Sequence, residues 1–188
     1  IQNRQGIYCL SLVTYKSSFL YPMKELNLWA KKNNSIIIWD LSHAIGSVEI
    51  DLIESQSKIA VGCSYKYMNG GPGSPAFMFI EKELQNQLNN PIQGWFGHKN
   101  PFDFEPSYKP NSSINKFSSG TIPILSMQAM EAGVDLTLTA GIKNIRKKSV
   151  KLSRFFLDGI EKKLIKLGFK VESPLNSDIR GSHLAISH

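Results

Sequence analysis

The segment SIIIWDLSHAIG (residues 35–46) joins a short run of branched apolar residues to a polar turn. A run of this length and composition predicts a buried β-strand that ends at Asp40. The apolar segment GIYCLSLV (6–13) predicts another strand, and the segment between them, MKELNLWAKKNN (23–34), carries apolar residues at helical spacing. A strand, a helix and a strand in this order predict a βαβ unit with parallel strands.

Two further apolar runs extend the predicted sheet. KIAVGCS (58–64) and PAFMFI (75–80) have the length and the branched or aromatic residues of buried strands. The sequence therefore predicts an α/β fold whose sheet is parallel in large part.

The second half of the chain is expected to be helical after a long irregular loop. Residues 91–123 are rich in Gly, Pro, Asn and Ser, and a loop of this length inside a domain is usually functional. Thr121 is the expected N-cap of a helix over residues 124–138, with Pro123 near its first turn.

A long amphipathic helix is then expected from about Gly141 to Leu167, with Gly168 as its stop. Its apolar side is formed by Ile142, Ile145, Phe155, Phe156, Ile160 and Leu164. The last segments, FKVES (169–173) and SHLAIS (182–187), predict two strands of a smaller unit.

The composition is ordinary for a soluble globular protein, with 41% hydrophobic and 20% charged residues among 188. No apolar stretch approaches the ~20 residues needed to cross a bilayer, so no membrane partner is expected. Cys9 and Cys63 lie in strand-like runs and are expected to be buried free thiols, which fits the cytoplasm.

The formal net charge of +7 raises the question of a nucleic-acid partner. The basic stretch KNIRKKSVKLSR (143–154) alternates charged with apolar residues, as the solvated face of a helix does. No aromatic platform or nucleic-acid motif accompanies it, so no nucleic acid is expected as a partner.

Three chemically active residues follow the predicted strands. Asp40 ends one strand, His43 lies three residues later, and Lys66 follows the strand over 58–64. Open α/β sheets bind ligands outside the carboxyl ends of their strands. These side chains are therefore expected to face one crevice, although 26 positions (66 − 40) separate Asp40 from Lys66.

Lys66 stands between Tyr65 and Tyr67 and directly before the turn NGGPG (69–73). In a pyridoxal 5′-phosphate site, a lysine amine bonds to the cofactor aldehyde. A carboxylate on the opposite side keeps the pyridine nitrogen of the cofactor protonated. Lys66 and Asp40 match this pattern. The tyrosines would help to desolvate the amine, and the glycines allow the backbone to turn tightly.

Each member of this set also has an ordinary structural explanation. An aspartate at a strand end is often a turn residue, a single histidine is often only hydrogen-bonded, and a loop lysine is usually solvated. The glycine-rich turn lacks the spacing of a P-loop. The combination of Asp40, His43 and Lys66 is more specific than any one of them, and it favours pyridoxal phosphate.

The chain resembles the kynureninase family of pyridoxal-phosphate enzymes. The resemblance is carried by WDLSHAIGSVEIDL, VGCSYKYMNGGPGSPAF and GWFGH, and it extends through SSGTIPI, IRKKSV and RGSHLAISH over essentially the whole chain. It implies the aspartate-aminotransferase fold, an α/β fold with three layers and a mostly parallel sheet. Residues 1–145 would be the C-terminal part of the large cofactor-binding domain, and residues 146–188 the linking helix and the start of a small domain.

The resemblance also implies roles for single residues. Lys66 would carry the cofactor and move the substrate proton, and Asp40 would pair with the pyridine nitrogen. His43 would lie close to the cofactor, and Tyr65 would reach the phosphate and serve in proton transfer. The remaining cofactor contacts would come from Ser11, Trp95 and Thr121, the last two as phosphate contacts across a dimer interface.

The family reaction is the hydrolysis of L-kynurenine, or of 3-hydroxykynurenine, to anthranilate or its hydroxylated form and L-alanine, a step of tryptophan catabolism toward NAD precursors. The resemblance implies a homodimer with shared active sites. A phosphate-binding loop is expected before Ile1, and an arginine for the substrate carboxylate beyond His188. We therefore expect a piece of a longer polypeptide that is inactive alone.

Two alternatives stay open. A cysteine desulfurase or related enzyme of the same fold would typically carry histidine directly before the lysine and glutamine a few residues after the aspartate, where this sequence has Tyr65 and His43. A basic binding module without enzyme activity is the other alternative, supported by the net charge alone.

Overall fold

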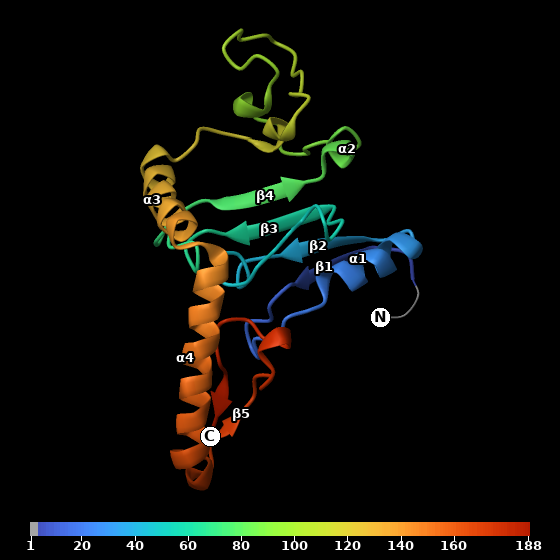
Figure 1. Ribbon diagram of the computed structural model, residues 1–188. Helices are drawn as coiled ribbons and strands as arrows, with labels where there is room; N and C mark the ends of the chain where they lie inside the picture. The colour runs from blue at the N-terminus through green and yellow to red at the C-terminus, as the bar shows by residue number, and fades with distance from the viewer. Residues whose placement is uncertain (1–3) are drawn as a thin grey trace.

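The computed structural model describes residues 4–188 and is built around a four-stranded sheet (Figure 1). In spatial order the strands are β1 (Ile7–Ser11), β2 (Ile36–Asp40), β3 (Ile59–Cys63) and β4 (Ala76–Ile80). β1, β2 and β3 run parallel to one another, and β4 runs antiparallel to β3. The prediction of a mostly parallel α/β sheet is confirmed.

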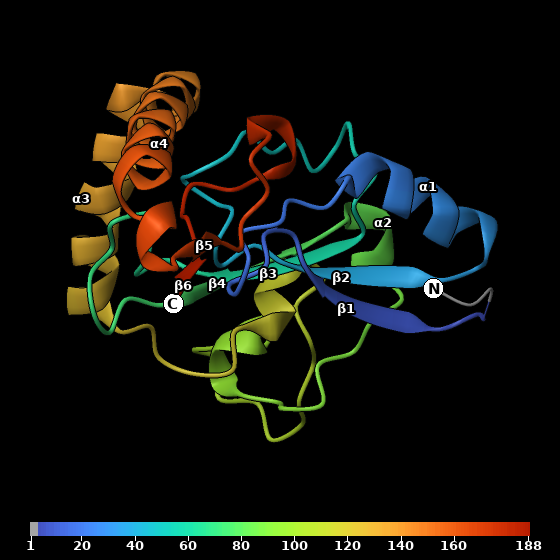
Figure 2. The same ribbon diagram turned by 90° about the horizontal axis from the view of Figure 1, so that it is seen from below.

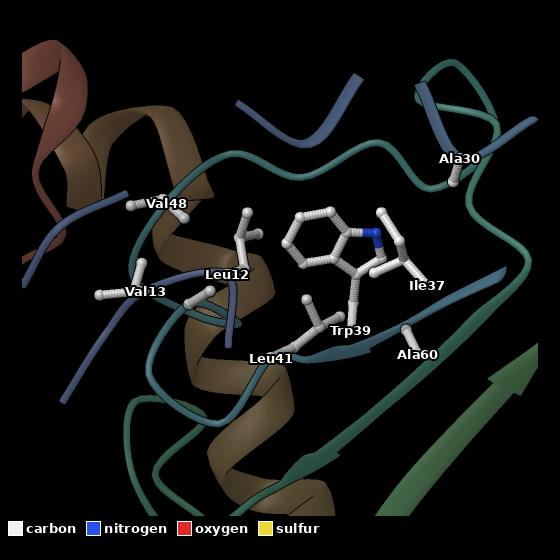
Figure 3. Packing of buried hydrophobic residues seen from close by; sticks show 9 residues of the cluster. Leu12, Val13, Ala30, Ile37, Trp39, Leu41, Val48 and Ala60 are labelled. Atoms are coloured by element: carbon white, nitrogen blue, oxygen red, sulfur yellow. The ribbon is translucent and has the colours of Figure 1, made fainter. Parts of the chain in front are cut away.

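Helix α1 (Met23–Lys32) connects β1 to β2 and lies on one face of the sheet (Figure 2). The hydrophobic core is on this face and surrounds Trp39, which is fully buried (Figure 3). The indole N–H of Trp39 donates to Asn27 Oδ1 of α1 at 2.8 Å, so the one polar atom of the ring is satisfied. Because side chains alternate along a strand, Ile36, Ile38 and Asp40 occupy the opposite face and are only half-buried.

Two helices lie near the carboxyl ends of the parallel strands (Figure 1). They are α3 (Ile124–Ala140) and α4 (Ile142–Lys163), separated at Gly141, whose φ of 75° breaks the helical backbone. A short 3₁₀ turn (Ile165–Leu167) continues α4, and Gly168 ends it with a φ of 91°, as predicted.

The remaining elements are short. Between β4 and α3 lie α2 (Lys82–Gln85) and two 3₁₀ turns, η1 (Trp95–Gly97) and η2 (Ile114–Phe117). After α4, the antiparallel strands β5 (Lys170–Val171) and β6 (Ile186–Ser187) enclose the 3₁₀ turn η4 (Ser177–Ile179). None of the helices within residues 4–188 combines the length and the apolar character that a membrane crossing needs.

Four local predictions are wrong. Thr121 is not an N-cap, because the helix begins at Ile124 and Pro123 takes the capping position. Cys9 is exposed rather than buried, because β1 is an edge strand and Cys9 points away from the core face, while Cys63 is half-buried. The two strands predicted in the last twenty residues shrink to β5 and β6, since only two residues of each find a partner. Phe155 and Phe156 are exposed rather than packed on the apolar side of α4.

Candidate active site

The parallel strands bring Ser11 and Asp40 side by side. They are paired in the register of β1 and β2 at the carboxyl ends of both strands. The hydroxyl of Ser11 donates to Asp40 Oδ2 at 2.9 Å, and the backbone N–H of Ser42 donates to Asp40 Oδ1 at 2.9 Å. Both carboxylate oxygens are therefore hydrogen-bonded, and the direction of the Asp40 side chain is fixed.

This arrangement keeps Asp40 ionised. Partial burial by itself raises the pKa of the Asp40 carboxyl, but the hydrogen bonds from Ser42 and Ser11, together with the nearby His43, lower it by more. The net pKa of Asp40 lies below its ordinary value, so the group is a carboxylate at neutral pH. A carboxylate held in this way can pair with a protonated ring nitrogen.

The turn after β2 is in direct contact with the turn after β3. The backbone N–H of Cys63 donates to Ser42 Oγ at 3.3 Å. At Gly46, with a φ of 76°, any Cβ would lie 2.5 Å from the carbonyl oxygen of Tyr67. This close approach requires glycine, and it brings the turn carrying His43 against the turn carrying Lys66.

Lys66 is half-buried, and its Nζ lies 5.2 Å from the centre of the Tyr65 ring. Tyr65 is 50% exposed, and its ring lies on one side of the amine. Tyr67 follows Lys66 in the sequence. Burial raises the pKa of the Tyr67 hydroxyl, and the nearby Lys66 charge lowers this pKa by less.

His43 lies within electrostatic range of both predicted partners. Burial lowers the pKa of His43, the charges of Lys66 and His183 lower it further, and Asp40 raises it by less. His43 is therefore neutral near pH 7. The structure thus brings Asp40, His43 and Lys66, with Ser11 and Tyr65, to the carboxyl edge of the parallel strands.

Trp95 and Thr121 lie away from this edge. The segment over residues 86–120 extends beyond β4, on the side of the sheet opposite α1 (Figures 1 and 2). Trp95 lies in this segment, is 43% exposed and contacts Phe96 and Phe102 edge to face. Thr121 is exposed in the three residues that precede α3. Within this chain, neither residue joins the group around Asp40.

Sequence reasoning missed His183. The ring of His183 lies 5.8 Å from that of His43, centre to centre. SHLAIS was expected to be a strand, and nothing in its local pattern indicates where His183 would lie.

Sequence reasoning also missed the role of Arg146, which was expected to be part of a solvated helix face. Its guanidinium donates to the carbonyl oxygens of Ser177, Arg180 and Gly181 at 2.6, 2.7 and 3.1 Å. Burial and the nearby Arg180 lower the pKa of Arg146, and Asp178 and Glu49 raise it by less. Arg146 fastens the segment that carries His183 onto α4.

The groups at this edge fit an organic cofactor. Residues 4–188 contain no cluster of three His, Cys, Asp or Glu side chains that could hold a metal ion. An ionised Asp40 and the amine of Lys66 at one edge are the two groups that a protonated pyridine ring with an aldehyde would use.

Comparison with known proteins defines the class. Residues 3–177 match the model of the aminotransferase class-V family, and the chain belongs to this family. Among individual relatives, the chain is 34% identical over 188 residues to a kynureninase of Pseudomonas fluorescens and 33% identical to one of Burkholderia pseudomallei. All of this chain is aligned, and it spans 45% of the length of each of these relatives.

Solved structures show the same fold. The chain is similar to a cysteine desulfurase from Thermococcus onnurineus, with a TM-score of 0.80 and 18% identity over 97% of this chain and 44% of that one. It is also similar to a C-DES mutant with glycine covalently linked to its pyridoxal-phosphate cofactor, with a TM-score of 0.82 and 12% identity over 100% of this chain and 48% of that one. Pyridoxal 5′-phosphate is the cofactor of this family, and the Asp40–Lys66 edge fits it.

Proposed function

We propose that the protein containing this chain hydrolyses L-kynurenine or 3-hydroxykynurenine to anthranilate or 3-hydroxyanthranilate and L-alanine. The observation that carries the proposal is that an ionised Asp40 and Lys66 follow adjacent parallel strands at one sheet edge, with His43 within electrostatic range of both. The 34% identity to a kynureninase over the whole chain supports this choice of reaction.

Bound pyridoxal phosphate supplies an electron sink for bond cleavage next to the substrate's α-carbon. Asp40 holds a proton on the pyridine nitrogen, and it does so because Ser11 and Ser42 keep its carboxylate ionised. Lys66 would bind the cofactor through its amine, and once the substrate amine replaces it there, the freed Lys66 amine would take the proton from the substrate α-carbon.

Tyr65 and His43 complete the site. The hydroxyl of Tyr65, a half-exposed residue, would hold the phosphate or pass a proton to the substrate. His43, neutral beside the Asp40 carboxylate, orients groups near the ring by hydrogen bonding. In this reaction, water would attack the side-chain ketone of the substrate.

Trp95 and Thr121 are proposed to bind the phosphate group of the cofactor in the second subunit of a homodimer with shared active sites. Their position supports this, because neither residue joins the group around Asp40 in its own chain. Thr121 lies just before the N-terminus of α3, where backbone N–H groups favour a phosphate.

We also keep the proposed division into residues 1–145 and 146–188, with α4 as the linking helix. Helix α4 continues without interruption through residues 145 and 146. Cys9 and Cys63 are free thiols, which supports a cytoplasmic location.

A cysteine desulfurase is the second candidate, favoured by the fold of the similar structures. Two observations count against it. Tyr65 and His43 stand where that group typically has histidine and glutamine. Within this chain, Cys9 and Cys63 lie in strands β1 and β3, where neither can move as a mobile nucleophile would.

The test uses the complete protein purified with pyridoxal phosphate. We expect anthranilate release from L-kynurenine, and an absorbance band near the visible edge that borohydride removes while labelling Lys66. Lys66→Ala should abolish both, whereas Lys147→Ala, at an exposed lysine of α4, should change neither. Sulfide release from cysteine without kynurenine hydrolysis would support the second candidate. Salt-sensitive polyanion binding without the band would support a basic binding module.

A further inference from the structure

Two histidines from distant parts of the chain lie against each other at the proposed site. The rings of His43 and His183 are 5.8 Å apart between centres and inclined by 51°. They are separated by 140 positions (183 − 43). The two rings are therefore neighbours, and a hydrogen bond between them needs two of their nitrogen atoms to lie about 3 Å apart.

The surroundings of His183 fix its tautomer. Its Nε2 lies 3.0 Å from the carbonyl oxygen of Tyr15, and because a carbonyl can only accept, Nε2 must carry the hydrogen. In the neutral ring, Nδ1 is then an acceptor. This Nδ1 is buried and has no hydrogen-bond partner among residues 4–188, which costs free energy unless a donor reaches it.

The segment carrying His183 is held from two sides. Arg146 of α4 binds three of its carbonyl groups, at Ser177, Arg180 and Gly181. Ser182 Oγ donates to the carbonyl oxygen of Ser47, which belongs to the same turn as His43. The acceptor is therefore kept next to His43 by contacts that do not involve His43 itself.

We propose that His183 is a positioning residue, whose Nδ1 accepts a hydrogen bond from a ring N–H of His43 and so selects the tautomer of His43. The other ring nitrogen of His43 is then an acceptor that the site can use. The proposed function is needed only to explain what His43 does in the reaction. The hydrogen bond between His43 and His183 is inferred from the geometry of this chain.

The charged and titratable groups around His43 are compatible with this bond. They are Asp40, Lys66 and His183, and with the burial of the ring their net effect is to lower the pKa of His43. A neutral His43 has one N–H and one acceptor, so a single bond to His183 determines which nitrogen is which.

The test is ¹⁵N NMR of the complete protein with labelled histidine. We expect one nitrogen of His43 to be protonated in a single tautomer, and a coupling across the hydrogen bond between a His43 nitrogen and His183 Nδ1. Absence of this coupling in the wild-type protein, with and without cofactor, overturns the proposal. Neither measurement depends on kynurenine turnover. A failure of this proposal can therefore be distinguished from a failure of the proposed function.

Two variants separate positioning from simple tethering. His183→Asn keeps an acceptor near the Nδ1 position and loses the bond to Tyr15, whereas His183→Gln keeps a donor for Tyr15 and loses that acceptor. We expect His183→Asn to keep the single His43 tautomer, and His183→Gln to give a mixture and lower kcat by roughly three- to tenfold. If His183→Gln behaves like wild type, or if both variants lose the tautomer equally, His183 is only a structural tether.

Discussion

At the scale of single residues, the site depends on how Asp40 stays charged while half-buried. Burial favours the protonated acid, and the hydrogen bonds from Ser42 and Ser11, together with the nearby His43, outweigh that effect. One donor is the backbone N–H of Ser42, which no substitution at that position except proline removes. The other is the Ser11 hydroxyl, which a single substitution can delete.

Replacing Ser11 with alanine should shift the acid limb of activity to higher pH. Loss of the hydroxyl removes one of the interactions that lower the pKa of Asp40, so this pKa rises toward its ordinary value. The ionised carboxylate is present above that pKa and is lost as the pH falls through it, so activity should fail at a higher pH than in the wild type. The measurement is kcat against pH in the complete protein.

Ser187→Ala in β6 is the control for this change, and its acid limb should match the wild type. An unchanged acid limb in Ser11→Ala would show that Asp40 does not depend on this hydrogen bond.

At the scale of elements, α3 supports the turn that carries Lys66. Gly133 of α3 is buried against this turn, where a Cβ would lie 2.5 Å from the carbonyl oxygen of Asn69 and 2.6 Å from that of Met68. Backbone atoms cannot move aside as a flexible side chain can, so the helix and the turn approach each other only because residue 133 is glycine.

Gly133→Ala should lower the free energy of unfolding by about 1–3 kcal/mol, because the added methyl group overlaps the turn. Gly159 of α4 is the matched control, since a Cβ there meets nothing within 4 Å. Gly159→Ala should raise the free energy of unfolding by about 0.5–1 kcal/mol. Urea unfolding of the complete protein measures both. Equal effects would mean that α3 does not rest on the turn.

At the scale of the whole molecule, large apolar surfaces are left for something else to cover. One face of the sheet is only half-buried, and α3 exposes most of its apolar side chains, namely Ile124, Leu125, Leu136 and Leu138. Apolar surface of this extent usually marks an interface. Further parts of a longer chain and a second subunit would both bury it.

Mixing two inactive variants tests the shared site. If Trp95 serves the site of the other subunit, a hybrid dimer of Lys66→Ala and Trp95→Ala subunits contains one site with both residues intact. Remixing the two variants should then restore up to about a quarter of wild-type kynurenine hydrolysis, as random pairing predicts. No recovery, with hybrid dimers shown by mass spectrometry, would place Trp95 in its own subunit's site or outside any site.

Much of the fold could be predicted because its determinants are local. The runs around Tyr8, Ile37 and Ala60 have the composition of buried strands, and α1, α3 and α4 show the spacing or the terminal residues of helices. The wrong predictions concern residues whose burial or strand pairing depends on other parts of the chain. Cys9 is exposed because of the place of β1 in the sheet, and the strands at the end of the chain are short because few residues find a partner.

The sequence by itself determined the four strands of the main sheet, the long helices and the edge at which Asp40, His43 and Lys66 gather, because parallel strands place their carboxyl ends together. Only the tertiary structure decided that Ser11 donates to Asp40, that Arg146 holds the segment over 177–181, and that His183 lies against His43. These contacts join residues 29 to 140 positions apart. They depend on how the helices, strands and turns pack against one another. This packing produces no periodic pattern in the sequence from which it could be predicted.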